Sequence, residues 1–243
     1  MIVAANRDEF YARPTSPAGF WEESPHIYAG RDLEKGGTWL GVNTNGQFAA
    51  LTNFRDPSSR KSNVKSRGLL VSSFLATKST SAEFMATVER EAANYDGFNF
   101  VAGDRTALHY FSSRNNDKQQ LTTGIYGVSN HLLDTPWPKL TRAKEDFRRY
   151  ITRGEPAFTE LFDLLADRFI ASDTELPETG IGIEWERKLS SIFIASADYG
   201  TRSSTIILFH HTGKIHFQEK RFGKNGDFIG ESKHVIESEP YKD

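Results

Sequence analysis

The sequence of 243 residues contains no cysteine. This absence excludes disulfide bonds, thiolate metal sites and cysteine nucleophiles within these residues, and it gives no information about the redox compartment. The sequence also lacks any apolar run close to the roughly 20 residues that span a bilayer, and its start lacks the basic region and long apolar core of a secretory signal. We therefore expect a cytoplasmic protein without integral membrane association.

A strong net charge is also missing. Lys and Arg number 30 and Asp and Glu number 32, which leaves a formal charge of -2. No bulk positive field is therefore present to hold nucleic acid or an anionic membrane. The length and the near-average share of charged residues, 26%, favour a globular chain. We expect one domain over 1–243, with its core at about 2–219 and a weakly ordered tail from about 231.

Strand and helix signals occur in separate clusters. Two short runs, 38–43 and 47–53, are joined through Asn45-Gly46, which predicts a hairpin because both residues tolerate positive φ. Helices are expected at 64–75 and after the capping-box spacing of Thr80 and Glu83. Later signals predict strands at 98–102, 107–111 and 125–129, helices from about 138 and 158, and strands at 191–195, 204–209 and 214–218. This segregation predicts an α+β fold of two stacked, mainly antiparallel sheets between helical layers.

The first ten residues combine a short apolar strand with a polar group, Asn6-Arg7-Asp8-Glu9. An Arg-Asp pair at a strand end is, by itself, more often a structural salt bridge than a site. Other distinctive fragments follow along the chain at 36–41, 51–54, 126–130, 135–137 and 199–206. In this order and spacing the fragments resemble the NRDE family, which includes the transport and Golgi organisation protein 2 proteins and takes its name from the first fragment.

The resemblance implies a fold related to the N-terminal nucleophile hydrolases, a four-layer αββα sandwich. This agrees with the order of elements predicted above. In the Cys-type hydrolases of this group, such as penicillin V acylases and bile salt hydrolases, the thiolate of a processed N-terminal Cys attacks an amide and its own α-amino group acts as base.

The resemblance also implies five catalytic positions. Arg7 or Asp8 would serve the nucleophile, the first by lowering a thiol pKa and the second by orienting the amine. Asn53 and Asn130 would donate to a developing oxyanion, although both also suit Asx turns that fix a chain reversal. Arg202 would bind a carboxylate or hold Asp8, and simple neutralisation of a buried Asp8 is the alternative.

Substrate-binding positions are expected at the same end of the chain and among the aromatic residues. Asn6 and Glu9 flank the Arg-Asp pair, and Trp39, Phe54 and Trp137 are candidates for an acyl or tetrapyrrole pocket, with a packing role in the core as the alternative. Trp137, between two prolines, is the strongest pocket candidate. No cofactor is implied, and no metal site is predicted, because adjacent strand residues such as His210 and His211 face opposite sides.

The resemblance has one important departure. Members of the family usually begin with Met-Cys and a strand before the segment that corresponds to 2–5, and here Met1 stands in that place. If this start is natural, the nucleophile, its amine and the first strand of a sheet are missing, and hydrolysis is implausible. If a longer chain precedes it, all three are restored and a strand edge is covered. We favour the second alternative.

Three functions therefore remain open. The first is a latent amide or acyl hydrolase of the N-terminal nucleophile type, acting on a small-molecule substrate when a longer form supplies the Cys. The second is a non-catalytic carrier of a hydrophobic acidic ligand, such as haem or a fatty-acyl conjugate. The third is a trafficking or interaction role, for which the sequence offers no motif. The sequence leaves the oligomeric state open.

Overall fold

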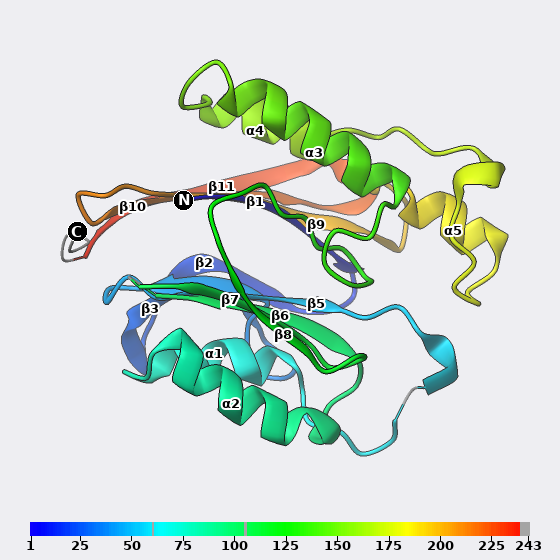
Figure 1. Cartoon of the computed structure of the whole chain (residues 1–243). Helices are drawn as coiled ribbons and strands as arrows, with labels where there is room; N and C mark the ends of the chain where they lie inside the picture. The colour runs from blue at the N-terminus through cyan, green and yellow to red at the C-terminus, as the bar shows by residue number, and fades with distance from the viewer. Residues whose placement is uncertain (60, 105, 239–243) are drawn as a thin grey trace.

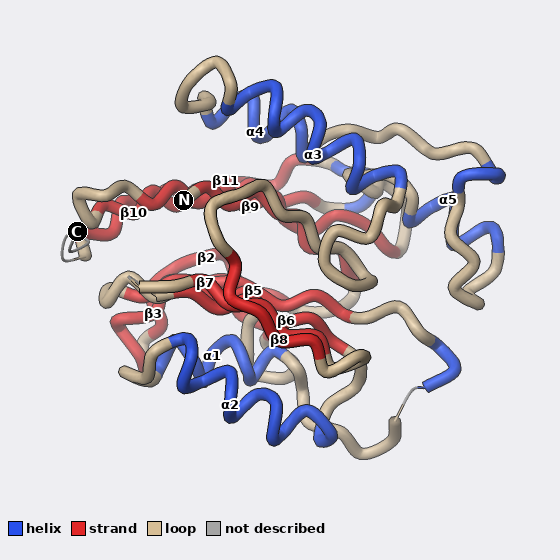
Figure 2. The backbone as a smooth tube through the Cα atoms, in the orientation of Figure 1, coloured by secondary structure: helices blue, strands red, loops and turns tan. Residues whose placement is uncertain are grey.

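The computed structural model describes residues 1–59, 61–104 and 106–238. Two antiparallel sheets lie face to face, and helices cover the outer face of each (Figures 1 and 2). The predicted α+β class and the four-layer αββα order are confirmed.

The larger sheet has seven strands in the order β2-β3-β4-β5-β6-β7-β8, so consecutive strands of the chain are neighbours. The predicted hairpin is confirmed, because β4 and β5 pair around a turn in which Gly46 has a φ of 82°. The strands are β2 (Thr15–Trp21), β3 (Ser24–Asp32), β4 (Leu40–Asn43), β5 (Phe48–Asn53), β6 (Phe98–Gly103), β7 (Leu108–Ser112) and β8 (Asp117–Leu121).

The smaller sheet joins the two ends of the chain in the order β1-β9-β10-β11. Strand β1 pairs antiparallel with β9, and the register shifts between Arg7 and Asp8. Such a shift bends a strand and re-aims the side chains beside it. The strands are β1 (Ile2–Phe10), β9 (Tyr199–Phe209), β10 (Lys214–Phe222) and β11 (Phe228–Glu237).

Two helices pack on each sheet. Helices α1 (Gly68–Ala76) and α2 (Ser81–Glu91) cover the seven-stranded sheet, and the capping box of Thr80 with Glu83 is confirmed at the start of α2. Helices α3 (Pro138–Ile151) and α4 (Phe158–Leu165) cover the four-stranded sheet, while the short α5 (Ile183–Leu189) lies at one end of the molecule (Figure 1).

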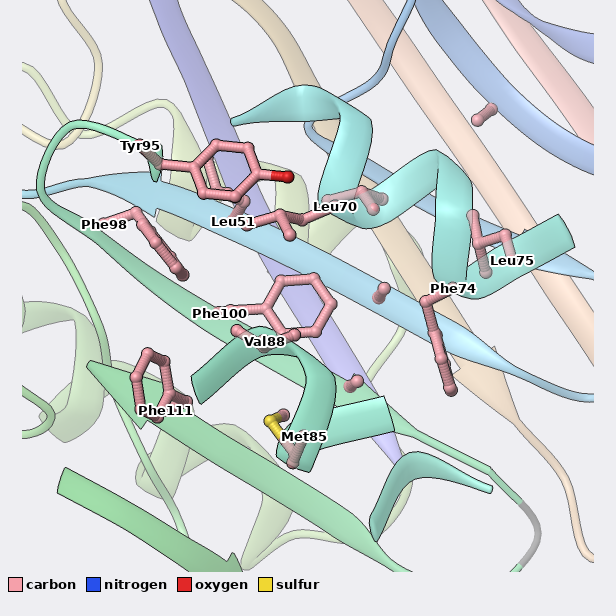
Figure 3. Packing of buried hydrophobic residues seen from close by; sticks show 14 of the residues in the cluster. Leu51, Leu70, Phe74, Leu75, Met85, Val88, Tyr95, Phe98, Phe100 and Phe111 are labelled. Atoms are coloured by element: carbon pink, nitrogen blue, oxygen red, sulfur yellow. The ribbon is translucent and has the colours of Figure 1, made fainter. Parts of the chain in front are cut away.

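Buried apolar residues form one cluster for each pair of facing layers. The cluster between α1, α2 and the larger sheet is rich in aromatic rings, including Phe74, Phe98 and Phe111 (Figure 3). A second cluster fills the space between the sheets, where Tyr28 and Phe217 meet with their ring centroids 5.0 Å apart. A third joins α3 and α4 to the smaller sheet. Each sheet is therefore buried on both faces.

Two expected strands are absent from the described residues, because other partners take their backbone groups. In 125–129, the N–H of Gly127 donates to the Asp134 carboxylate at 2.7 Å, and the Asp134 N–H returns to the Gly127 carbonyl. In 191–195, the Ile194 N–H donates to the Thr201 hydroxyl and the Ile192 carbonyl accepts from Asn6. Local bonds of this kind compete with a strand ladder.

The expectation of a weakly ordered tail from about 231 is wrong for the described part. Residues up to Glu237 belong to β11 and pair with β10, and the ring of His234 stacks on Tyr28 with centroids 5.1 Å apart. Pairing and stacking therefore fix this segment, and residues 239–243 lie outside the described residues.

Candidate functional site

The opening motif is divided between the two faces of β1, because successive strand residues point in opposite directions. Asn6 faces the helical layer, where its Nδ2 donates to the carbonyls of Leu165 and Ile192 at 2.8 Å each. Arg7 faces the other sheet, and its Nη1 donates to the Thr15 hydroxyl at 3.3 Å. The structure therefore places Asn6 and Arg7 on opposite faces of β1, and it gives Asn6 a structural role.

A cavity of about 1270 Å³ runs along β1 and borders both sheets. Of the predicted site residues, those that line it are Asn6, Arg7, Asp8, Glu9, Trp39, Asn53, Asn130 and Arg202. Among its described lining residues, ten are Lys or Arg and five are Asp or Glu. The cavity therefore has an excess of positive charge that the balanced sequence as a whole does not have.

Asp8 and Lys139 both line the cavity, and their charges interact without a direct hydrogen bond or ion pair. The Asp8 carboxylate accepts a hydrogen bond of 2.7 Å from the Thr201 hydroxyl, and burial raises the pKa of Asp8. Burial lowers the pKa of Lys139 to about 8, although the charge of Asp8 partly opposes this. Burial and the charge of Asp8 also raise the pKa of Tyr199. Burial therefore favours the neutral form of each of these three groups.

Sequence reasoning missed Lys139. The residue follows Pro138 in the first turn of α3, where the partial positive charge of the helix N-terminus disfavours a cation. A lysine directly after the proline that begins a helix is therefore the sequence signal that could have indicated Lys139. Its side chain lines the cavity and has no hydrogen bond or ion pair to another described residue.

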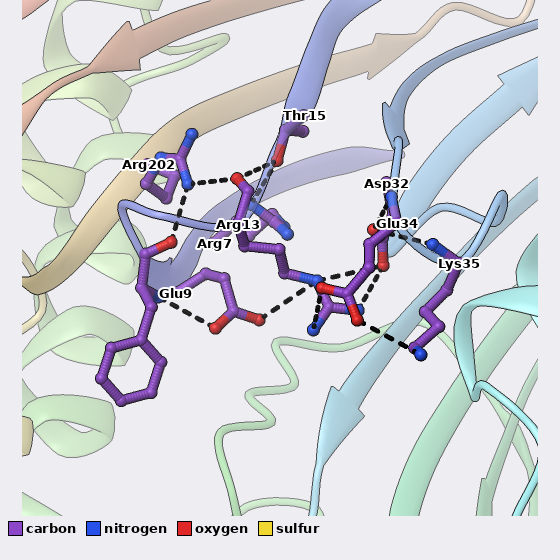
Figure 4. A network of polar contacts seen from close by, with 9 residues as sticks. Arg7, Glu9, Arg13, Thr15, Asp32, Glu34, Lys35 and Arg202 are labelled. Atoms are coloured by element: carbon purple, nitrogen blue, oxygen red, sulfur yellow. Dashed lines mark hydrogen bonds and ion pairs between the residues drawn. The ribbon is translucent and has the colours of Figure 1, made fainter.

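A second polar network lies at the end of β1 (Figure 4). Arg202 donates from Nη1 to the carbonyls of Phe10 and Arg13, at 2.9 and 3.0 Å, so it fixes the chain that follows β1. The expectation that Arg202 holds Asp8 is therefore wrong, because the Asp8 carboxylate bonds with Thr201 while the Arg202 guanidinium bonds with the backbone after β1. The Arg13 guanidinium lies 3.8 Å from Glu9 and 2.6 Å from Asp32.

The two predicted asparagines meet, but only one of them has a free amide. Asn130 donates from Nδ2 to the carbonyl of Asn53 at 3.0 Å, and its own carbonyl accepts from the Arg55 N–H at 2.7 Å. These two bonds agree with the alternative in which Asn130 fixes the path of the chain. The Asn53 side chain is exposed at the end of β5 and lines the cavity without a hydrogen bond to a described residue.

The aromatic candidates also divide into one that lines the cavity and two that do not. Trp39 lines the cavity, whereas Phe54 and Trp137 are not part of its lining. The Arg55 guanidinium covers the buried Trp137 ring at 4.7 Å, and Phe54 packs on His131 with centroids 4.9 Å apart. Packing by neighbouring side chains thus corrects the expectation that Trp137 and Phe54 form pocket surface.

Sequence reasoning also missed a buried ion pair between Arg55 and Glu186. The Arg55 Nη1 and the Glu186 Oε2 lie 2.7 Å apart, with the side chains 8% and 4% exposed. Glu186 also accepts from the N–H and hydroxyl of Thr179. The pair connects α5 to the chain that leaves β5.

The described residues contain neither of two further kinds of feature, metal-binding groups and membrane-spanning helices. They contain no group of three or more His, Cys, Asp or Glu side chains placed to hold a metal ion. No helix among them has the length and apolar character needed to cross a membrane.

Comparisons with known proteins give one family. The sequence pattern of the family described as Transport and Golgi organisation 2 matches residues 1–224. The chain is 38% identical over 239 residues to the Transport and Golgi organization protein 2 homolog of Bos taurus, with 90% of this chain and 86% of that protein covered. It is 37% identical over 237 residues to the homolog of Homo sapiens, with the same coverage.

Among solved structures, a variant of the conjugated bile acid hydrolase from Clostridium perfringens aligns with 100% of this chain and 95% of its own chain. The TM-score is 0.48 and the sequence identity is 9%.

Proposed function

The chain belongs to the Transport and Golgi organisation 2 family, and we propose that it binds a hydrophobic acidic ligand in the cavity along β1. The observation that carries the proposal is the combination of apolar depth and positive charge in one cavity. Haem and fatty-acyl conjugates combine a large apolar part with negatively charged groups, and these match the apolar depth and the positive charge of the cavity.

The apolar part of the cavity lies between the sheets. It is lined by Val3 and Ala5 of β1 and, from the facing sheet, by Leu40, Phe48 and Leu108. Apolar surface removed from water contributes about 25 cal/mol per Å². The volume of about 1270 Å³ exceeds the range of roughly 300–1,000 Å³ typical of drug-sized ligand sites. A long acyl chain or a tetrapyrrole therefore has room there.

Binding is tested by titrating the chain with haem and with palmitoyl-CoA while following tryptophan fluorescence. We expect saturable binding of at least one ligand. Ala5→Phe places a ring in the cavity and should weaken that binding about tenfold or more, since every 1.4 kcal/mol changes affinity tenfold. Ala86→Phe, on the exposed face of α2, is the matched control and should leave it unchanged. Absence of saturable binding of both ligands by the folded wild-type chain would reject the proposal.

A second candidate is amide or acyl hydrolysis of the N-terminal nucleophile type. It is favoured by the free amide of Asn53 and by the Asp8–Thr201 hydrogen bond, which lie on the same cavity. It requires a Cys that these 243 residues do not contain.

The hydrolase candidate is tested on the protein isolated from its source. A longer form with an N-terminal Cys should have a larger intact mass and should react with iodoacetamide, since the thiolate is the nucleophile. A native protein with the mass of these residues and no reaction with the reagent would eliminate the candidate.

A further inference from the structure

Three neighbouring strands of the smaller sheet bring Arg7, Ser203 and Arg221 into one transverse row, which we call the polar row. Arg7 of β1 pairs with Ser203 of β9, and Ser203 pairs in turn with Arg221 of β10. All three residues line the cavity. The strands therefore place one arginine on either side of one hydroxyl, and the guanidinium of Arg221 extends over Gly230 of β11.

The polar row lies on the face that meets the other sheet. Phe217 belongs to the cluster between the sheets, and strand alternation puts Glu219 and Arg221 on the same face. Glu219 confirms this direction, because its carboxylate accepts from the N–H of Ala18 in the facing sheet at 2.9 Å. The row is thus enclosed between the sheets.

Two polar atoms in and beside the row are buried without a partner among the described residues. These are the Nε of Arg221, which lines the cavity, and the hydroxyl of Thr205, which lies two residue pairs further along β9 and outside the cavity lining. The Arg7 guanidinium makes one hydrogen bond to a described residue, the contact of 3.3 Å to Thr15. Buried polar groups in folded proteins nearly always have partners. The Nε of Arg221, together with the guanidinium of Arg7, therefore offers donors to an acceptor bound in the cavity.

We propose that the polar row binds the carboxylate of a ligand that carries one, such as haem or a fatty acid, an inference that rests on the proposed binding function. A carboxylate above Ser203 accepts one hydrogen bond from the Ser203 hydroxyl and charge-assisted hydrogen bonds from Arg7 and from the unpartnered Nε of Arg221. The charge of Glu219 is compensated by the two arginines, which leaves one positive charge for the ligand.

This position also sets the direction of the ligand. Ala5 and Val3 follow Arg7 on the same face of β1, and Val3 is four residues away, about 13 Å at roughly 3.3 Å per residue. Both side chains line the cavity and pack against the cluster between the sheets. The apolar chain of the ligand therefore runs along β1 toward Val3 with its carboxylate at the row.

The test compares cis-parinaric acid with the alcohol of the same chain, using the fluorescence of the polyene. Wild-type protein should bind the acid about tenfold or more tightly than the alcohol, the effect expected of charge-assisted hydrogen bonds. Arg221→Gln should remove most of this ratio and leave alcohol binding unchanged. Lys220→Gln is the matched control, because Lys220 lies on the opposite face of β10 with its Nζ 4.1 Å from the Phe162 ring centroid.

Each outcome decides between the two proposals. Equal binding of acid and alcohol, or a ratio unchanged in Arg221→Gln, overturns the head-group site and leaves ligand binding intact. Binding of neither probe overturns the head-group site, and the binding function is overturned as well only if haem and palmitoyl-CoA also fail to bind. If Arg221→Gln does not fold, Ser203→Ala takes its place, with a smaller loss of the ratio expected. If the alkyl phosphate with the same hydrocarbon chain binds more tightly than the acid, the carboxylate is overturned as the head group and a phosphate takes its place in the proposal.

Discussion

At the scale of single residues, Lys139 is a charged group in an unusual position. It is a cation in the first turn of a helix, and burial lowers its pKa to about 8. The nearby charge of Asp8 opposes this change and raises the pKa. About a tenth of the amine is therefore uncharged at pH 7, far more than for an ordinary lysine, and the side chain lines the cavity.

We predict that Lys139 reacts faster with acetic anhydride than Lys144 of the same helix, which is held by Asp134 at 2.6 Å. In Asp8→Asn the charge that raises the pKa of Lys139 is gone, so this pKa falls further and more amine is neutral at pH 7. The labelling rate of Lys139 should then rise about two- to fivefold, as measured by peptide mass spectrometry. Equal rates at the two lysines, or no response to Asp8→Asn, would contradict this account.

The residues also show what the sequence predicts about the site. The Asn6 to Glu9 motif correctly indicated where polar groups gather, because the family pattern is local. It did not separate Arg7 from Asp8, or Arg202 from both, because a register shift between paired strands decides which face each side chain takes. Such a shift depends on a partner strand nearly 200 residues away.

At the scale of elements, local sequence signals correctly predicted the turns and helix ends that are stabilised by bonds between nearby residues. The Asn45-Gly46 turn and the capping box of Thr80 depend on residues close in the sequence, and both form as expected. The segment 191–195 has the composition of a strand, but distant side chains such as Asn6 take its backbone groups. The polar β8 (Asp117–Leu121) was missed for the converse reason, since pairing with β7 alone defines it.

The short α5 gives the prediction at this scale, because it is held by a buried ion pair. Glu186→Ala leaves the Arg55 guanidinium buried without its partner, which should lower the free energy of unfolding by about 3–5 kcal/mol. Urea unfolding measures the loss. The control is Glu184→Ala in the same helix, where an exposed ion pair with Arg187 should contribute little. Similar losses in the two variants would show that the buried pair has no special role.

At the scale of the whole molecule, the order of layers follows from the segregation of strands and helices, and the sequence predicted it. The sequence did not predict that the two ends of the chain share a sheet, since β1 and β11 are brought together only through β9 and β10. The cavity arises at this scale, because residues of both sheets and of α3 line it. The charge and the volume of the cavity therefore could not be predicted from any single segment of the sequence.

The single domain over 1–243 stays a prediction, and its test is cooperative unfolding. Phe217 is 1% exposed in the cluster shared by both sheets, so Phe217→Ala should cost about 3–5 kcal/mol. Because the two layers share this cluster, amide exchange in α1 and in α4 should accelerate together, and fluorescence and circular dichroism should report one transition. Val235→Ala, at an exposed side chain of β11, should change little. If α4 loses protection while α1 keeps it, the sheets unfold as separate units and the chain has two domains.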